Sequence, residues 1–144
     1  MTGSITLAAS ISQAFATINV QGGNLIAVEQ GAVAVNNAVV TATNLVRENR
    51  GTLTLTGLTT DLGSNAKFIV TNLNGSAITA TNGMVAPWII NHFTAATPSF
   101  VTTGANGLVL SSYTAAADAT ALQNVTTSQI GDVTAAVTLT NNAS

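Results

Sequence analysis

Apolar and polar residues alternate in short runs along most of this chain. Because successive side chains of a β-strand point to opposite faces, this alternation predicts strands. The clearest run is Thr-Leu-Thr-Leu-Thr at 52–56, and the runs are bounded by Gly, Asn and Asp, which favour turns. The predicted strands are 17–20, 25–28, 32–35, 39–46, 52–56, 67–71, 77–81, 99–102, 108–110 and 133–140. Segment 115–123 instead predicts a short helix or an irregular stretch, with Asp118 available as a cap.

The polar positions of this pattern are mostly neutral. The 144 residues include 24 Thr and 15 Asn, and only 6% of residues are charged, against roughly 25% in an ordinary soluble protein. Threonine favours strands and asparagine favours turns, and only Pro87 and Pro98 would interrupt a hydrogen-bonded ladder. With 47% apolar residues, the composition predicts one all-β domain that spans residues 1–144.

The low charge favours one all-β architecture over the others. In a parallel β-solenoid, each turn of the chain stacks on the previous one at about 4.8 Å. Stacked charges would repel each other, whereas stacked Asn and Thr side chains can hydrogen-bond along the stack. We therefore expect a right-handed parallel β-helix, with irregular coils because no strict repeat is visible. An antiparallel β-sandwich is the alternative, because strand order cannot be read from one sequence.

A β-helix would have two open ends. At roughly 20–25 residues per coil, the chain would form about six coils, or about 30 Å of solenoid. Segments 2–9 and 133–140 look like strands that could pair with another chain, and neither carries a cluster of charges that would cap the stack. The pattern predicts that the ends join neighbouring repeats of a longer chain or stack head to tail into a fibre.

The middle of the chain resembles a known family. Residues 44–55 contain Arg47-Glu48-Asn49-Arg50-Gly51-Thr52-Leu53, which is similar to the R-x-x-x-G-T-L step of autotransporter-associated β-strand repeats. Further steps of that pattern match in order: the Gly-hydrophobic stretch that ends in Pro87-Trp88, the step at Phe100, the Gly-hydrophobic step at Gly107-Leu108, and Tyr113. The likeness covers residues 20–140 and departs from the pattern at Pro98-Ser99, where an acidic residue is expected before Phe100.

This family consists of giant bacterial surface and secreted proteins. The resemblance implies a right-handed parallel β-helix, an extracellular or cell-surface location in bacteria, and a longer parent chain with flanking repeats. It implies no catalytic residues and no cofactor.

Composition excludes several other functions. The net charge of -2 arises from three basic and five acidic residues, too few cations to neutralise a run of phosphates, so nucleic acid is not expected as a partner. The longest apolar run, 84–90, is far shorter than the roughly 20 residues of a membrane-spanning helix. There is no Cys and one His, His92, while Asp61, Asp118 and Asp132 lie far apart, so neither a metal site nor an enzyme is expected.

Two groups of residues remain as candidate sites. Arg47, Glu48 and Arg50 form the densest charge cluster, and we interpret it as a structural corner in which arginine hydrogen-bonds loop carbonyls. The aromatic residues either fill the core or stack on a glycan. They are Trp88, Phe93, Phe100 and Tyr113.

The sequence therefore predicts a non-catalytic structural or adhesive module at a bacterial surface, whose partner is itself or flanking repeats. A glycan- or partner-binding module and a phage fibre or virion component are the alternatives.

Overall fold

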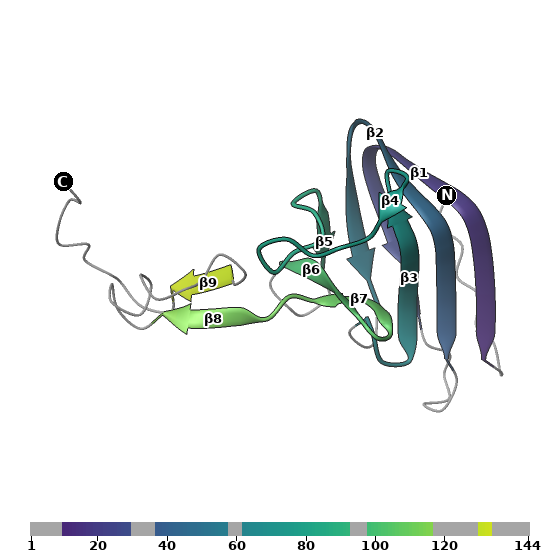
Figure 1. The fold of residues 1–144 in the computed structure, drawn as a ribbon. Coiled ribbons are helices and arrows are strands. Elements are labelled where there is room, and N and C mark those ends of the chain that lie inside the picture. The colour runs from purple at the N-terminus through teal and green to yellow at the C-terminus, as the bar shows by residue number, and fades with distance from the viewer. Residues whose placement is uncertain (1–9, 30–36, 58–61, 93–97, 117–129, 134–144) are drawn as a thin grey trace.

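The computed structural model describes residues 10–29, 37–57, 62–92, 98–116 and 130–133, and all its regular elements are strands. Seven strands form one curled sheet, and two more pair separately (Figure 1). The strands of the large sheet are β1 (Ile11–Ala27), β2 (Ala38–Thr56), β3 (Ala66–Leu73), β4 (Ser76–Ala77), β5 (Ile89–Asn91), β6 (Ser99–Gly104) and β7 (Gly107–Leu110). The separate pair is β8 (Tyr113–Ala116) and β9 (Ile130–Val133).

The first three strands run parallel to one another. Strand β2 lies in the middle, with β1 along its whole length on one side, and with β3 and then β5 on the other side. Ile11 pairs with Ala38, and Ala38 pairs with Ala66, so successive strands are offset by 27 and then 28 residues. This spacing is longer than the 20–25 residues per coil that the sequence predicts.

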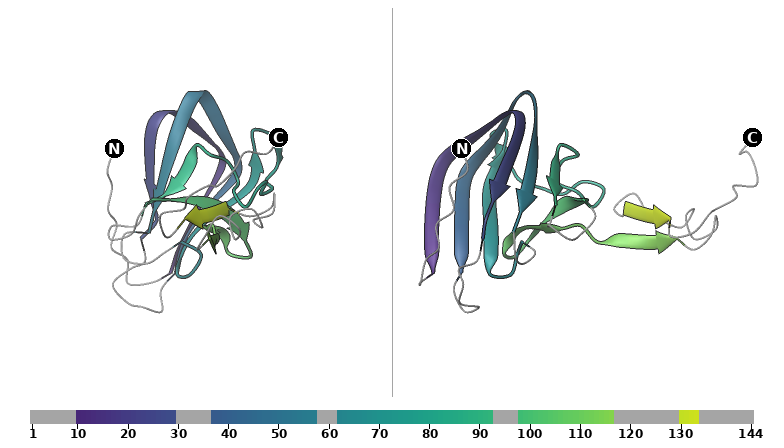
Figure 2. Two further views of the ribbon diagram at one scale, coloured as in Figure 1. Left: turned by 90° about the vertical axis from the view of Figure 1, so that its left-hand side faces the viewer. Right: turned by 180° about the vertical axis from the view of Figure 1, so that it is seen from behind.

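The long strands are bent, which curls the sheet around an interior. In β2 the buried positions alternate up to Ala42 and resume at Leu45, so the period of two breaks between them. A second bend follows at 49–51, where Asn49 and Arg50 adopt positive φ angles of 46° and 60°. The two views of Figure 2 show β1 and β2 folding over as nested arches. Each arch carries one strand segment on either side of the bend.

The remaining strands of the large sheet turn back and pair antiparallel. Strand β4 pairs with β3, β6 with β5, and β7 with β6. Asn74 and Gly75, with φ angles of 51° and 83°, form the two-residue turn between β3 and β4. Positive φ at both turn residues is the geometry that Asn-Gly favours in hairpins.

The fold-class prediction is therefore wrong in its main part. The chain is all-β, but its large sheet mixes parallel and antiparallel pairs and curls into a half-barrel, so it is neither a right-handed parallel β-helix nor an antiparallel β-sandwich. The physical reason is local: the turn after β3 inserts a short antiparallel pair, and although β5 pairs parallel with β2 again, the chain then reverses into β6 and β7, where a β-helix would continue into another parallel coil. The departure begins at Asn74-Gly75.

Several predicted strands lie inside the observed ones. The run 17–20 and all of the run 25–28 except Val28 are parts of β1, because the chain passes the Gly22 turn position as a bulge instead of reversing. The runs 39–46 and 52–56 are likewise both within β2. The runs 67–71, 99–102 and 108–110 coincide with β3, β6 and β7, whereas of 77–81 only Ala77 is in a strand.

Other predictions fall outside the described residues. These are the segments 2–9, 32–35 and 134–140, and most of the predicted helix at 115–123. Ala115 and Ala116, the part of that helix that is described, belong to strand β8, which pairs parallel with β9. None of the described residues forms a helix of the length and apolarity needed to cross a membrane.

The core lies on the inner side of the curl. It is built from residues at the same register position of neighbouring strands, so that one apolar side chain packs on the next. Its largest fully buried apolar members are Phe68, Leu45, Leu53, Leu55, Ile89, Leu108, Val20 and Val101. This core stabilises the curled sheet, and β1 lies at the margin of the core.

Candidate functional site

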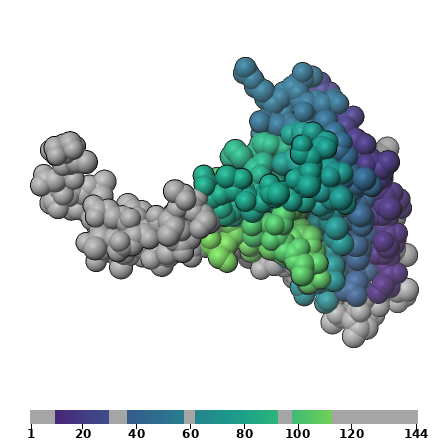
Figure 3. Space-filling view, viewed as in Figure 1, coloured from purple at the N-terminus to yellow at the C-terminus, as the bar shows by residue number. Residues whose placement is uncertain are grey.

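Strand β1 is the longest edge strand of the large sheet, which also ends at the short strands β4 and β7. It pairs with β2 on one side, and no described strand pairs with its other side. Figure 3 shows its atoms, in purple, along one flank of the molecule. None of its 17 residues is charged, although charged side chains and prolines are the usual means of keeping an edge strand from pairing.

Apolar side chains of β1 that face the interior are nevertheless exposed. Ile11 and Phe15 pair with the buried Ala38 and Ala42, so they point to the inner side of the curl. They are 40% and 43% exposed because β1 is the last strand. Leu25, further along β1 and 62% exposed, pairs with Thr54 and lies on the outer face of the sheet. The core is therefore uncovered at this end of the sheet.

The backbone of β1 also presents N–H and C=O groups to the open side, where Ala14 O accepts a hydrogen bond from Gln13 Nε2 at 3.3 Å. The amide N of Ile11 donates to Asn37 O at 2.8 Å, towards β2. In a parallel ladder, alternate residues direct their N–H and C=O groups to opposite sides. The peptide groups of Ser12 and Ala14 therefore face away from β2, towards the open edge.

The opposite end of the sheet is closed. Because Ala38 N donates to Asn65 O, the carbonyl of Phe68 points away from β2. Gly107 of β7 lies against this carbonyl so closely that a Cβ on Gly107 would collide with Phe68 O and lie 2.9 Å from Phe68 C. Strand β6 covers the free side of β5 in the same way, through antiparallel pairing. Continued parallel stacking is blocked there.

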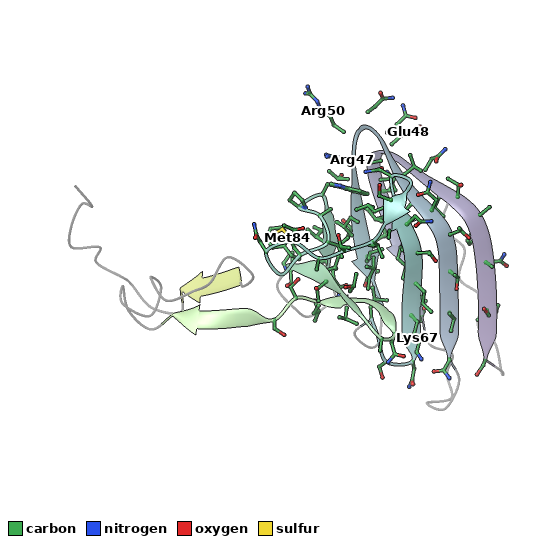
Figure 4. All side chains as sticks on the ribbon, viewed as in Figure 1. Arg47, Glu48, Arg50, Lys67 and Met84 are labelled. Carbon is green, nitrogen blue, oxygen red and sulfur yellow. The ribbon has the colours of Figure 1, made fainter. Side chains whose placement is uncertain are left out.

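The charged cluster of the sequence lies at the second bend of β2. Figure 4 shows Arg50 projecting beyond the bend and Arg47 lying below it, towards the sheet. The Arg47 side chain donates from Nε to Gly51 O at 2.8 Å and from Nη2 to Arg50 O at 3.3 Å. Its backbone N donates to Asn74 Oδ1 at 2.8 Å, which ties the bend to the turn after β3. The described residues include no ion pair between Arg47 and Glu48.

The same guanidinium lies over an aromatic ring. Arg47 Cζ is 5.3 Å from the centroid of the Trp88 ring, within the range of a cation–π contact. Trp88 is half-buried and packs against the core. One face of the indole is thus occupied by the chain's own arginine, and a sugar would have to displace it.

The other predicted aromatic residues belong to later segments of the chain. Phe100 is half-buried in β6, opposite Ile90 of β5. Tyr113 begins β8, and only its backbone is described, while Phe93 lies outside the described residues.

Asn91 is the buried polar residue that sequence analysis missed. It is 1% exposed in β5, and neither Nδ2 nor Oδ1 of its amide has a hydrogen-bond partner. Its register partners are Leu55 of β2 and Ser99 of β6, so the amide lies between an apolar and a polar side chain. The alternation of the chain gave no signal for this position, because Asn91 follows two isoleucines and reads as the end of an apolar run.

The remaining titratable residues are dispersed. His92 is exposed, and its backbone N donates to Leu55 O at 2.8 Å. Among the described residues there is no group of three or more His, Cys, Asp and Glu that could hold a metal ion. Asp61 and Asp118 lie outside the described residues, and Asp132 is described only as part of the β9 backbone.

Comparisons of the chain with protein-family models, with curated proteins and with solved structures give no match. The resemblance to autotransporter-associated repeats therefore stays a prediction from the sequence.

Proposed function

We propose that this chain is a non-catalytic structural module that joins another polypeptide through the open edge of β1. The single observation that carries the proposal is the state of this strand: it is 17 residues long and uncharged, and its interior-facing Ile11 and Phe15 are exposed. Such an edge offers both backbone hydrogen bonds and apolar contacts to an added strand.

The rest of the sheet supports assembly at this place. The far edges of β3 and β5 are covered by β7 and β6, and the bend of β2 is held by the Arg47 hydrogen bonds. A module with one long uncovered edge, beside the short edge strands β4 and β7, suits a part that adds to something larger. Segments 2–9 and 133–140, which the sequence suggests as joining strands, are outside the described residues for the most part, and β1 takes that role in this proposal.

We extend the proposal to location. The resemblance of residues 44–55 to autotransporter-associated repeats suggests a bacterial surface or an extracellular site, where the module would act in structure or adhesion. Fractionation of the native host checks this: recovery with the cell envelope or the medium supports it, and recovery with the cytosol contradicts it.

The joining edge is tested by one substitution that blocks added strands without disturbing β1–β2 pairing. Ala14→Pro removes an N–H that faces the open side, a position at which an edge strand tolerates proline. We expect the wild-type chain to self-associate over a concentration series in sedimentation velocity, and Ala14→Pro to remain monomeric with an unchanged far-UV circular dichroism spectrum.

The control is Thr54→Pro in β2, an interior strand with partners on both sides. It should lose the β spectrum, because proline is not accommodated within a sheet. Self-association that survives in folded Ala14→Pro, or a wild-type chain that stays monomeric throughout, contradicts the proposal.

A further inference from the structure

We propose that the partner at the β1 edge is a second copy of this chain, bound antiparallel across a two-fold axis at Gln13. The product is a closed dimer, not a fibre. This inference rests on the proposed function, since it names the partner and the geometry of the same edge.

Only one end of the sheet can join. A head-to-tail fibre needs an open edge at both ends of each copy, so that β1 of one molecule adds to the far end of the next. The far end is occupied by the antiparallel strands, with Gly107 against the carbonyl of Phe68 and Phe100 opposite Ile90. The other strands that end the sheet, β4 (Ser76–Ala77) and β7 (Gly107–Leu110), are short. Within the described residues, the edge long enough to receive β1 of one molecule is therefore β1 of another. When the same surface of two copies forms the contact, the product is a dimer with two-fold symmetry.

The straight part of β1 is symmetric about Gln13. The strand runs in regular register with β2 from Ile11 to Phe15, and no pair joins Ala16 to β2 before pairing resumes at Thr17. Ile11 and Phe15 are the two exposed apolar residues at the ends of this five-residue stretch, and both face the interior. Antiparallel pairing about Gln13 places Ile11 of each copy opposite Phe15 of the other. The exposed apolar residues of one copy are thereby covered by those of its partner.

The hydrogen-bonding pattern agrees with this register. The peptide groups of Ser12 and Ala14 face the open side, because that of Ile11 faces β2. Pairing about Gln13 sets Ser12 opposite Ala14 of the second copy, so the outward groups of each meet as a hydrogen-bonded pair. Gln13 opposite Gln13, and Ile11 opposite Phe15, are then non-hydrogen-bonded pairs, in which side chains approach most closely.

The lack of charge on β1 permits this contact. In a two-fold interface the residue on the axis meets its own copy, and a charged residue there would repel itself. Strand β1 contains no Asp, Glu, Lys or Arg. The Gln13 amides on the axis can instead donate to and accept from each other.

A cysteine on the axis tests the geometry. The chain has no cysteine of its own, so Gln13→Cys introduces a single thiol that faces its copy at a separation of about 4.5 Å between Cα atoms, within the range of a disulfide. Under mild oxidation we expect Gln13→Cys to become a covalent dimer of twice the 14.4 kDa chain mass.

The matched control is Leu25→Cys, on the same strand and 62% exposed but far from the axis. Gln13→Cys should crosslink about tenfold faster or more, because the two thiols share a preformed dimer and react at a high effective concentration. Circular dichroism of both reduced variants establishes that each is folded.

The outcomes separate this inference from the proposed function. If folded Gln13→Cys crosslinks no faster than Leu25→Cys while the wild-type chain associates and Ala14→Pro does not, the two-fold geometry is wrong and edge joining stands. Open-ended oligomers or fibres that Ala14→Pro abolishes would likewise overturn the closed dimer and leave edge joining in place. A chain that stays monomeric, or that associates equally with Ala14→Pro, overturns both.

Discussion

Asn91 stands out among single residues because a buried amide without partners destabilises the protein that contains it. Leaving such a group unsatisfied costs about 1–3 kcal/mol, and Asn91 is 1% exposed with both amide atoms unpaired. Its neighbours in register are Ser99 on one side and, on the other, Leu55 followed by Ile26. A residue of similar volume without polar atoms would suit this position better.

We therefore expect Asn91→Val to raise the free energy of unfolding by about 1–2 kcal/mol. Valine also suits a strand, because its branched Cβ fits the pleated surface. Chemical denaturation with matched m-values measures the change. Asn91→Asp is the control: it keeps the shape but buries a charge at neutral pH, so it should lower stability. A stability loss in Asn91→Val would instead show that the amide is satisfied in solution, for instance by an ordered water.

At the scale of elements, the bend of β2 depends on a close approach to β1. Gly51 faces the backbone of β1, and a Cβ added to it would collide with Val20 O and lie 2.7 Å from Val20 C. The Arg47 side chain donates to the carbonyl of this same glycine. Because Gly51 has no side chain, the bends of β1 and β2 can pack closely. Its carbonyl also accepts the hydrogen bond from Arg47 that holds the bend of β2.

Gly51→Ala should lower the free energy of unfolding by about 1–3 kcal/mol, because the two arches must separate to admit the methyl group. Gly23→Ala is the matched control: Gly23 lies in the facing bend of β1, and an added Cβ there has nothing within 4 Å. That change should leave stability unaltered or raise it by up to about 1 kcal/mol. Equal losses in both variants would contradict a specific contact between Gly51 and Val20.

The strands could be predicted from the sequence better than the turns that connect them. Alternation located the segments of β2 and β3, because an apolar side chain at every second position has to face a core. Two tight turns could be read from the sequence, at Asn74-Gly75 and at Asn82-Gly83. Both residues of each pair have positive φ. Asn-Gly flanked by strand-like runs is a strong hairpin signal. The expectation of a β-helix did not take this signal into account.

The candidate site could likewise be predicted only in part, because its residues could be found in the sequence but their contacts could not. Arg47 could be singled out because charge is scarce in this chain, but its contact with Trp88 joins residues 41 positions apart, which no local pattern shows. The role of β1 was hidden for a related reason. A strand becomes an edge through the order of the whole sheet, and that order depends on the reversals after β3 and β6.

At the scale of the whole molecule, the sheet is asymmetric. One end is closed by antiparallel strands, and the other exposes part of the core at Ile11 and Phe15. A folded chain with an uncovered core gains stability from whatever covers it, since a partner that binds the folded state alone shifts the unfolding equilibrium. Stability and assembly are therefore coupled in this protein.

This coupling makes the unfolding temperature depend on protein concentration. If two copies cover each other at β1, a hundredfold rise in concentration across the dissociation constant should raise the midpoint of thermal unfolding by about 2–5 °C. Calorimetry at several concentrations measures it. Ala14→Pro should unfold at one temperature throughout, because it keeps the fold and cannot add a strand at the open edge. Equal concentration dependence in the two proteins would mean that the copies meet at a surface other than β1.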